Sequence, residues 1–308
     1  MFGNAEGARA VPGQRSGGAG APRFRGRVVV LGNEKGGAGK STLAALISVA
    51  MLYRGQRVST IDLDLRQQSL SRLLANRRQW LPAAGIDAPS PREYKLVDDP
   101  ASIADDQPTA LRLFDRAISM AMRDSDLVVI DTPGGDTAVS RAAHAQADLI
   151  VTPMNDSFVD FDVIGNVDPV TMALSRVSHY AETVLDARKF RERHNRTLDW
   201  IVLRNRLAGA DTANRERIRV ALNSLAGEVG FRIGPPLRER VAYREMFPFG
   251  LTLADVSAGL RPDGVNSPKL AARQEVNALL EALGLIVLAR PETPTDHQPE
   301  GAGLAASL

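Results

Sequence analysis

The chain has 308 residues, no cysteine and a formal net charge of +2. This length suits a large α/β domain with a sizeable core. Without cysteine the chain forms no disulfide, no thiolate zinc site and no iron–sulfur cluster, which fits a reducing cytoplasm. A metal site built on imidazole is also disfavoured, because the four histidines are scattered along the sequence: His144, His179, His194 and His297.

The two ends of the chain differ in composition from the rest. Residues 1–24 are rich in Gly, Ala, Pro and Arg, and the stretch 290–308 contains many Pro, Thr and Gly residues. We expect a disordered leader and a disordered tail around one domain over residues 25–289. The leader lacks the apolar segment of a signal peptide, and no apolar run is long enough to span a membrane.

A glycine-rich segment, Gly32–Thr42, lies between a predicted strand and a predicted helix. Val28–Leu31 is a buried β-branched run, and Leu43–Arg54 carries apolar residues at helical spacing. Backbone N–H groups in such a turn can wrap a triphosphate, and the helix dipole favours its charge. Lys40 would neutralise the β- and γ-phosphate oxygens. The predicted nucleotide-binding residues are Gly36, Gly37, Ala38, Gly39, Lys40, Ser41 and Thr42.

Carboxylates end two further predicted strands. The strand Arg57–Asp62 leads to Asp64, and four apolar residues after Asp126 lead to Asp131. Because the carboxyl ends of parallel strands meet at one sheet edge, these groups would face the same phosphates as the glycine-rich segment. Asp131 and the Ser41 hydroxyl would hold Mg²⁺. The alternative for Asp62 and Asp64 is that they form a solvated turn at the end of their strand.

The other segments alternate between helical and strand patterns, which predicts an α/β fold: one doubly wound, mostly parallel sheet with helices on both faces. The proline-rich stretch 82–108 is expected to be irregular. Two interpretations fit the acidic-aromatic stretch 154–162. It begins a helix capped by Asp156 or Ser157, with Phe158 and Phe161 in the core, or it has a functional role. The expected helices are Ser69–Trp80, Ala110–Arg123, Thr212–Val229 and Lys269–Leu283, and the expected strands are Ala147–Pro153, Leu198–Leu203 and Phe231–Ile233.

The glycine-rich segment resembles the deviant Walker A motif of the ParA/MinD family of P-loop ATPases, with Glu34 where the usual pattern has glycine. The resemblance covers about residues 27–285. Four stretches look most similar to MipZ, the α-proteobacterial ATPases that place the division plane: GNEKGGAGKS at 32–41, DLDLRQ at 62–67, TPMNDSFVDFD at 152–162 and FPFG at 247–250.

The resemblance implies roles for individual residues. Lys35 would reach across a dimer to the partner's nucleotide, and Asp64 would position the attacking water. Asp62 would lie near the metal shell, and Asn205 would contact adenine. The implied catalytic residues are therefore Lys35, Lys40 and Asp64, with ATP and Mg²⁺ as cofactors.

The resemblance also implies partners: a homodimer on ATP binding, non-specific DNA, FtsZ, whose assembly the dimer would inhibit, and ParB, which would recruit the protein. We expect a cytoplasmic, nucleoid-associated protein. Between Arg204 and Arg244, nine arginines stand against four acidic residues, a local balance of +5. Such side chains are often a solvated edge, but clustering favours phosphate contacts. The candidates are Arg215, Arg217, Arg219, Arg238, Arg240 and Arg244.

Two other functions fit parts of the pattern. A ParA-type DNA segregation ATPase would use the same switch to move DNA. An ATP-dependent ligase such as dethiobiotin synthetase shares the fold but has no need of Lys35. The membrane binding of MinD relatives is disfavoured here, because the final helix, Lys269–Leu283, has a core-like apolar face and no basic stripe follows it.

Overall fold

The computed structural model describes residues 26–155, 158–168, 174–205, 212–238, 245–260 and 268–287. The leader 1–24 and the tail 290–308 lie outside these residues, as do Asp156 and Ser157, so those expectations stay predictions. In the described part of the chain, no helix is long and apolar enough to cross a membrane.

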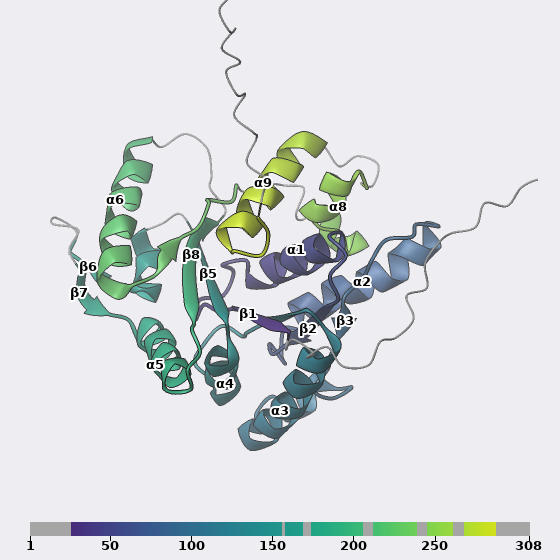
Figure 1. Cartoon of the computed structure of the whole chain (residues 1–308), viewed down its shortest axis with the longest axis horizontal. Helices are drawn as coiled ribbons and strands as arrows, with labels where there is room; N and C mark the ends of the chain where they lie inside the picture. The colour runs from purple at the N-terminus through teal and green to yellow at the C-terminus, as the bar shows by residue number, and fades with distance from the viewer. Residues whose placement is uncertain are drawn as a thin grey trace, which may run out of the picture.

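A seven-stranded sheet with strand order β3-β2-β4-β1-β5-β8-β9 forms the centre of the molecule (Figure 1). Every neighbouring pair is parallel, so the predicted doubly wound α/β fold is confirmed. The strands are β1 (Arg27–Leu31), β2 (Val58–Asp62), β3 (Arg92–Glu93), β4 (Leu127–Asp131), β5 (Leu149–Asn155), β8 (Asp199–Asn205) and β9 (Arg232–Ile233).

Helices cover both faces of the sheet (Figure 1). One core contains residues of α3 (Gln107–Asp124), α4 (Ala138–Gln146), α5 (His179–Arg193) and α6 (Thr212–Val229). The other core contains residues of α1 (Lys40–Leu52), α2 (Ser69–Ala83), α8 (Leu253–Ala258) and α9 (Lys269–Ala282). Short 3-10 helices lie at η1 (Pro100–Ile103), η2 (Phe158–Val163) and η3 (Phe247–Phe249), and β6 (Gly165–Val167) pairs antiparallel with β7 (Leu174–Val177).

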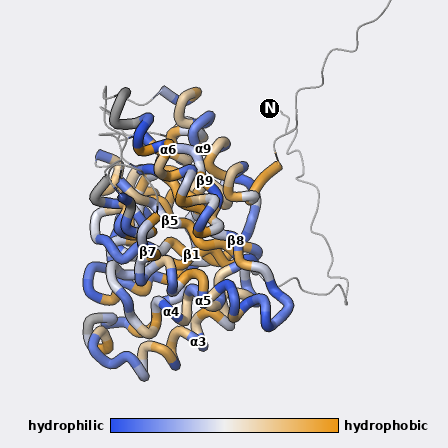
Figure 2. The backbone as a smooth tube through the Cα atoms, turned by 90° about the vertical axis from the view of Figure 1, so that its left-hand side faces the viewer, coloured by the Kyte–Doolittle hydropathy of each residue, from blue (hydrophilic) through white to orange (hydrophobic). Residues whose placement is uncertain are grey.

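The β-branched run of β1 explains why the sheet is covered on both sides. Val28 and Val30 belong to one core, whereas Val29 and Leu31 belong to the other. Successive side chains of a strand point to opposite faces, so a continuous apolar run needs helices above and below it. Figure 2 shows the result: hydrophobic strands in the interior and hydrophilic segments toward the outside.

Several expected boundaries shift in the structure. The helix after the glycine-rich segment begins at Lys40, and α2 continues through Pro82 to Ala83. The proline-rich stretch contributes the edge strand β3 and η1. The acidic-aromatic stretch forms the 3-10 helix η2, with Phe161 only 2% exposed. The alternating order implies a helix of unstated bounds between the strands Ala147–Pro153 and Leu198–Leu203, where α5 lies, but it does not predict β6 and β7.

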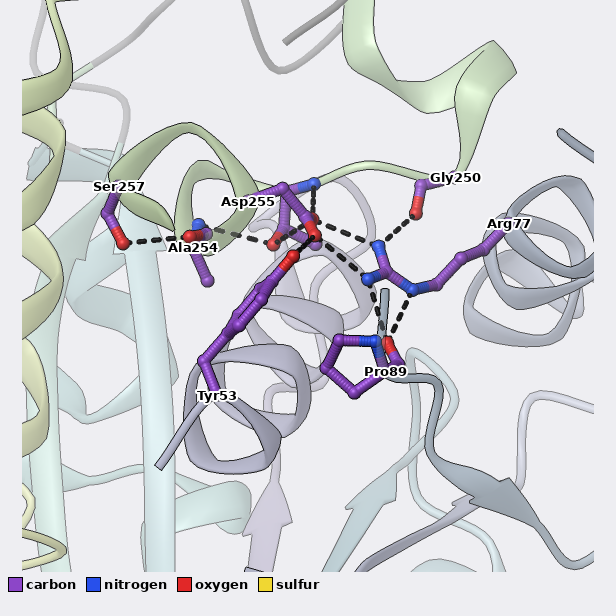
Figure 3. A network of polar contacts seen from close by, with 8 residues as sticks. Tyr53, Arg77, Pro89, Gly250, Ala254, Asp255 and Ser257 are labelled. Atoms are coloured by element: carbon purple, nitrogen blue, oxygen red, sulfur yellow. Dashed lines mark hydrogen bonds and ion pairs between the residues drawn. The ribbon is translucent and has the colours of Figure 1, made fainter. Parts of the chain in front are cut away.

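A buried ion pair connects α2 with α8, and a tyrosine that follows α1 joins it (Figure 3). The guanidinium of Arg77 in α2 contacts both carboxylate oxygens of Asp255 in α8 at 2.8 and 3.0 Å, and both side chains are fully buried. The Tyr53 hydroxyl after α1 donates to Asp255 at 2.9 Å, and Arg77 also donates to the carbonyl oxygens of Pro89 and Gly250. This network fixes α2, which directly follows the Asp62–Asp64 turn.

Candidate nucleotide-binding site

The predicted site residues meet at the carboxyl edge of the sheet because the central strands end in register. Asp131 of β4 is the partner of Leu31 in β1 and of Asp62 in β2. The glycine-rich segment Gly32–Thr42, called the P-loop from here on, continues β1 from the same level. The structure therefore brings both strand-end carboxylates beside the P-loop, as the sequence pattern predicts.

The P-loop backbone adopts a form that exposes its N–H groups. Gly37 and Gly39 have φ values of 76° and 94°, which residues other than glycine rarely adopt. Gly39 is also the N-cap of α1, so no side chain of the cap covers the first turn of the helix. Asn33 pins the start of the loop by donating to the Pro153 carbonyl at 2.6 Å. A helix N-terminus presented in this way is an anion site.

Lys40 is almost buried, with 7% of its surface exposed. Its ammonium group donates to the carbonyl oxygens of Asn33 at 3.0 Å and Lys35 at 3.2 Å. Burial lowers the pKa of Lys40, while the negative charges of Asp131 and Asp64 counteract this effect. The amine is thus held beneath the loop, next to the place where phosphate oxygens would bind.

Asn205 lies at the end of β8 and contacts the P-loop from the other side. Its side-chain amide donates to the Ala38 carbonyl at 2.7 Å, and a Cβ at Gly39 would lie only 2.3 Å from its nitrogen. Asn205 therefore supports the backbone of the P-loop, and its contact with adenine stays a prediction.

Asp131 is fully buried, and the half-buried Asp62 lies close enough to repel it. Burial is the main cause that raises the pKa of Asp131 well above its usual range, followed by repulsion from Asp62. Burial likewise raises the pKa of Asp62 to about 6, although it accepts backbone hydrogen bonds from Ser71 and Asp64 at 2.9 and 3.0 Å. The positive charge of Lys40 offsets only part of the effect on Asp131.

These carboxylates fit a divalent cation. Among the described residues, neither buried oxygen of Asp131 has a hydrogen-bond partner of ordinary geometry, although Ser41 and Lys40 are close enough to favour its charged form. Mg²⁺ prefers carboxylate and hydroxyl oxygens together with phosphates and waters. Ser41 and Asp131, with Asp62 beside them, form such a donor set.

Asp64 borders a cleft of about 380 Å³ whose lining includes Gly36 of the P-loop, Pro133 and Gly134 after β4, and Gln107 of α3. Its carboxylate accepts from the Gln67 N–H at 2.9 Å, which fixes its direction. The cleft is much larger than the roughly 30 Å³ of one water molecule. It has room for a terminal phosphate with an attacking water beside Asp64.

Lys35 differs from Lys40 in its surroundings. Its side chain is 33% exposed, and its ammonium lies 3.5 Å from the carboxylate of Asp160 in η2. The buried ring of Phe161 anchors that 3-10 helix. No role is predicted for Asp160 within the stretch 154–162, where the sequence signal is a carboxylate beside an aromatic anchor.

The predicted DNA-binding arginines are only partly described. Arg217 and Arg219 are exposed on α6, where Arg219 Nε donates to Glu216 at 2.8 Å, and Arg238 is exposed after β9. The opposite face of α6 is core, because Ile218 and Leu222 are buried as expected. Arg240, Arg244 and the side chain of Arg215 lie outside the described residues.

Comparison with known proteins agrees with this geometry. A family model described as "ATPase MipZ" matches residues 27–287. Protein ParA of Rhizobium radiobacter is 26% identical over 226 residues, which cover 72% of this chain and 83% of that protein. The chromosome-partitioning ATPase Soj of Thermus thermophilus is 30% identical over 151 residues, covering 44% of this chain and 57% of Soj.

Solved structures show the same fold. The ATP complex of a McdA variant from Cyanothece superposes with a TM-score of 0.57 at 17% identity, covering 86% of this chain and 99% of McdA. The septum site-determining protein MinD of Pyrococcus horikoshii, complexed with Mg-ADP, has a TM-score of 0.52 at 18% identity, covering 84% and 96% of the two chains.

Proposed function

The chain belongs to the MipZ family and is an ATPase, and from this premise we propose that it is an ATP-driven monomer–dimer switch that positions the division site. In this proposal the ATP-bound dimer binds DNA without sequence preference and inhibits FtsZ assembly, and ParB recruits the protein. MipZ membership over nearly the whole described chain supports this assignment.

One observation supports the proposed switch most strongly: the two lysines of the P-loop differ in how far they are buried. Lys40 is buried under the loop, whereas Lys35 lies partly exposed on its rim. A second cation on the rim is placed for a nucleotide held by another copy of the chain. Two nucleotides enclosed between two such loops would make hydrolysis the timer of the dimer.

The proposed chemistry is in-line attack of water on the γ-phosphate. Lys40 and the P-loop N–H groups hold the phosphates, and Asp64 orients the water. Ser41 and Asp131 would hold Mg²⁺, which neutralises charge on the β- and γ-phosphates. Because such transition states need little covalent help from the protein, positioning and charge supply the rate.

Light scattering coupled to size-exclusion chromatography tests the switch. The protein should run as a monomer without nucleotide or with ADP, and as a dimer with a non-hydrolysable ATP analogue. Lys35→Ala should stay monomeric with the analogue while still binding it. A nucleotide-independent oligomeric state would overturn the proposal, as would a Lys35→Ala dimer.

The second candidate is a ParA-type segregation ATPase, favoured by the match to ParA over 72% of the chain. Both candidates predict an ATP-dependent dimer that binds DNA. They differ in the effect expected on FtsZ. If the chain positions the division site, the ATP-bound dimer should lower the mass of FtsZ polymer that sediments. Unchanged polymer mass would favour segregation.

A further inference from the structure

His179, the first residue of α5, joins three segments around the nucleotide site. Its Nε2 lies 2.9 Å from Asp136, in the loop after β4. Arg141 of α4 contacts the same Asp136 oxygen. Glu34 of the P-loop acts on His179 electrostatically. The P-loop, the loop after β4 and the start of α5 therefore share one cluster of charged groups.

The loop after β4 is held at several points. At its start, the Thr132 hydroxyl donates to the Leu31 carbonyl of β1 at 2.8 Å. In its middle, Gly134 packs on the P-loop so closely that a Cβ there would lie 3.3 Å from the Glu34 carbonyl oxygen. At its end, Asp136 contacts Arg141, which follows in the same segment, and His179, which is 43 residues away.

The start of α5 is a firm anchor for this contact. Ser178 caps the helix by accepting from the Ala181 N–H at 3.0 Å, and its own N–H donates to the Ile164 carbonyl at 3.0 Å. Tyr180 is 3% exposed and shares a hydrogen bond of 2.8 Å with Thr152 of β5. His179 thus stands on backbone that the core holds in place.

We propose that His179 is a positioning residue for ATP hydrolysis: through Asp136 it holds the loop Pro133–Gly135 against the P-loop. Donor groups of a loop beside a phosphate lower the barrier only when they are fixed before the reaction. Arg141 belongs to α4, which directly follows the loop in sequence, whereas His179 ties the loop to α5, a different element. The proposal concerns the ATPase reaction and is independent of the division-site function.

The contact depends on the charge of the imidazole. Asp136 is the main cause that raises the pKa of His179, helped by Glu34 and Glu182, while Arg141 competes for the same carboxylate. The attraction is therefore complete below the raised pKa of His179, as long as the Asp136 carboxyl, whose pKa is lowered, stays ionised. The attraction is lost as the pH rises through the raised pKa of His179.

Steady-state hydrolysis by the full chain tests the proposal with His179→Gln, His179→Lys and the control His194→Gln. His194 lies just after the other end of α5, and its ring packs at a tilt against that of Phe190. We expect His179→Gln to lower kcat about 3- to 10-fold, well below the ~10²-fold loss that misplaced reacting groups can cause, with KM for ATP changed less than twofold. His179→Lys should restore kcat, and the control should match the wild type.

Two further readouts separate positioning from a merely structural role. The kcat ratio of wild type to His179→Lys should fall as pH rises from about 6 to about 8.5, because only the imidazole loses its charge in this range. In an Asp136→Asn background, His179→Gln should have no additional effect. The proposal is overturned if His179→Gln retains wild-type kcat, if the lysine variant fails to restore it, or if the two substitutions act additively.

Discussion

At the scale of single residues, Lys35 and Lys40 show how one turn places two lysines in different surroundings. The ion pair of Lys35 with Asp160 connects the P-loop to η2, a segment 125 positions further along the chain. In the proposed dimer, Lys35 must leave this carboxylate to reach a second nucleotide. The pair therefore opposes dimerisation, by no more than about 1 kcal/mol per chain because it is partly exposed.

This opposition predicts the effect of Asp160→Ala. Removing the carboxylate removes this one opposing contact of Lys35, so the fraction of dimer at limiting ATP analogue should rise, by up to about fivefold in the association constant for each released pair. Analytical ultracentrifugation across analogue concentrations measures the shift. Asp162→Ala, an exposed position of the same 3-10 helix, is the matched control. Weaker dimerisation by Asp160→Ala would contradict the opposing role.

Asp64 allows a second test at this scale. Asp64→Ala should bind ATP and dimerise normally, because Asp64 lies in the cleft beside Gly36 and outside the phosphate-holding backbone. Turnover should fall about 10²-fold or more, since the attacking water is no longer oriented. Phosphate release and size-exclusion chromatography measure the two properties. Hydrolysis at the wild-type rate would remove Asp64 from the mechanism.

At the scale of elements, the Arg77–Asp255 pair connects α2 to α8 without contact with water. Arg77→Met leaves the Asp255 carboxylate buried without its guanidinium partner, which costs about 3–5 kcal/mol of unfolding free energy. Arg72→Met is the matched control, because Arg72 lies exposed on the same helix. That control should cost less than about 1 kcal/mol.

Urea denaturation of both variants measures this difference. Equal losses for Arg77→Met and Arg72→Met would show that the buried network contributes nothing special to the fold. A larger loss for Arg77→Met should come with weaker ATP hydrolysis only near the unfolding transition. The pair contacts Tyr53 at the C-terminal end of α1, whereas the P-loop lies at the N-terminal end of this helix.

The elements also show what the sequence predicts and where prediction ends. Apolar runs such as Val28–Leu31 and Leu127–Ile130 define their strands by local pattern, and their terminal carboxylates follow from parallel topology. The edge strand Arg92–Glu93 has two residues and no such run, so its existence depends on pairing with β2. The hairpin β6–β7 likewise contains polar residues that match no clear period.

The candidate site divides in the same way. The P-loop, Asp62, Asp64 and Asp131 are predictable because each follows a strand of recognisable pattern. The contacts of Lys35 with Asp160 and of Asp136 with His179 cannot be predicted in this way. They join segments that are distant in the sequence and come together only through the packing of η2 and α5. The sequence contains these residues, but no local periodicity pairs them.

At the scale of the whole molecule, charge is distributed unevenly: the chain carries +2 in total, but the segment from Arg204 to Arg244 has nine arginines and four acidic residues. A local excess of this kind favours a polyanion more than total charge does. In the described part of this segment, Arg217, Arg219 and Arg238 are exposed. A single chain offers few phosphate contacts, whereas a two-fold dimer doubles them.

The salt dependence of DNA binding tests this arrangement. If Arg217 and Arg219 each contact one phosphate, reversing both to Glu removes four contacts per dimer, and the slope of log K against log salt should become shallower by about 3.6. The loss should be similar for any base sequence, because phosphate contacts carry no base readout. The matched control reverses Arg112 and Arg116, two exposed arginines of α3, with the same change in net charge. Fluorescence anisotropy with a labelled duplex measures both variants with ATP analogue at several salt concentrations. An equal loss in the control would assign binding to net charge, and an unchanged slope in the α6 variant would exclude these two arginines from the DNA contact.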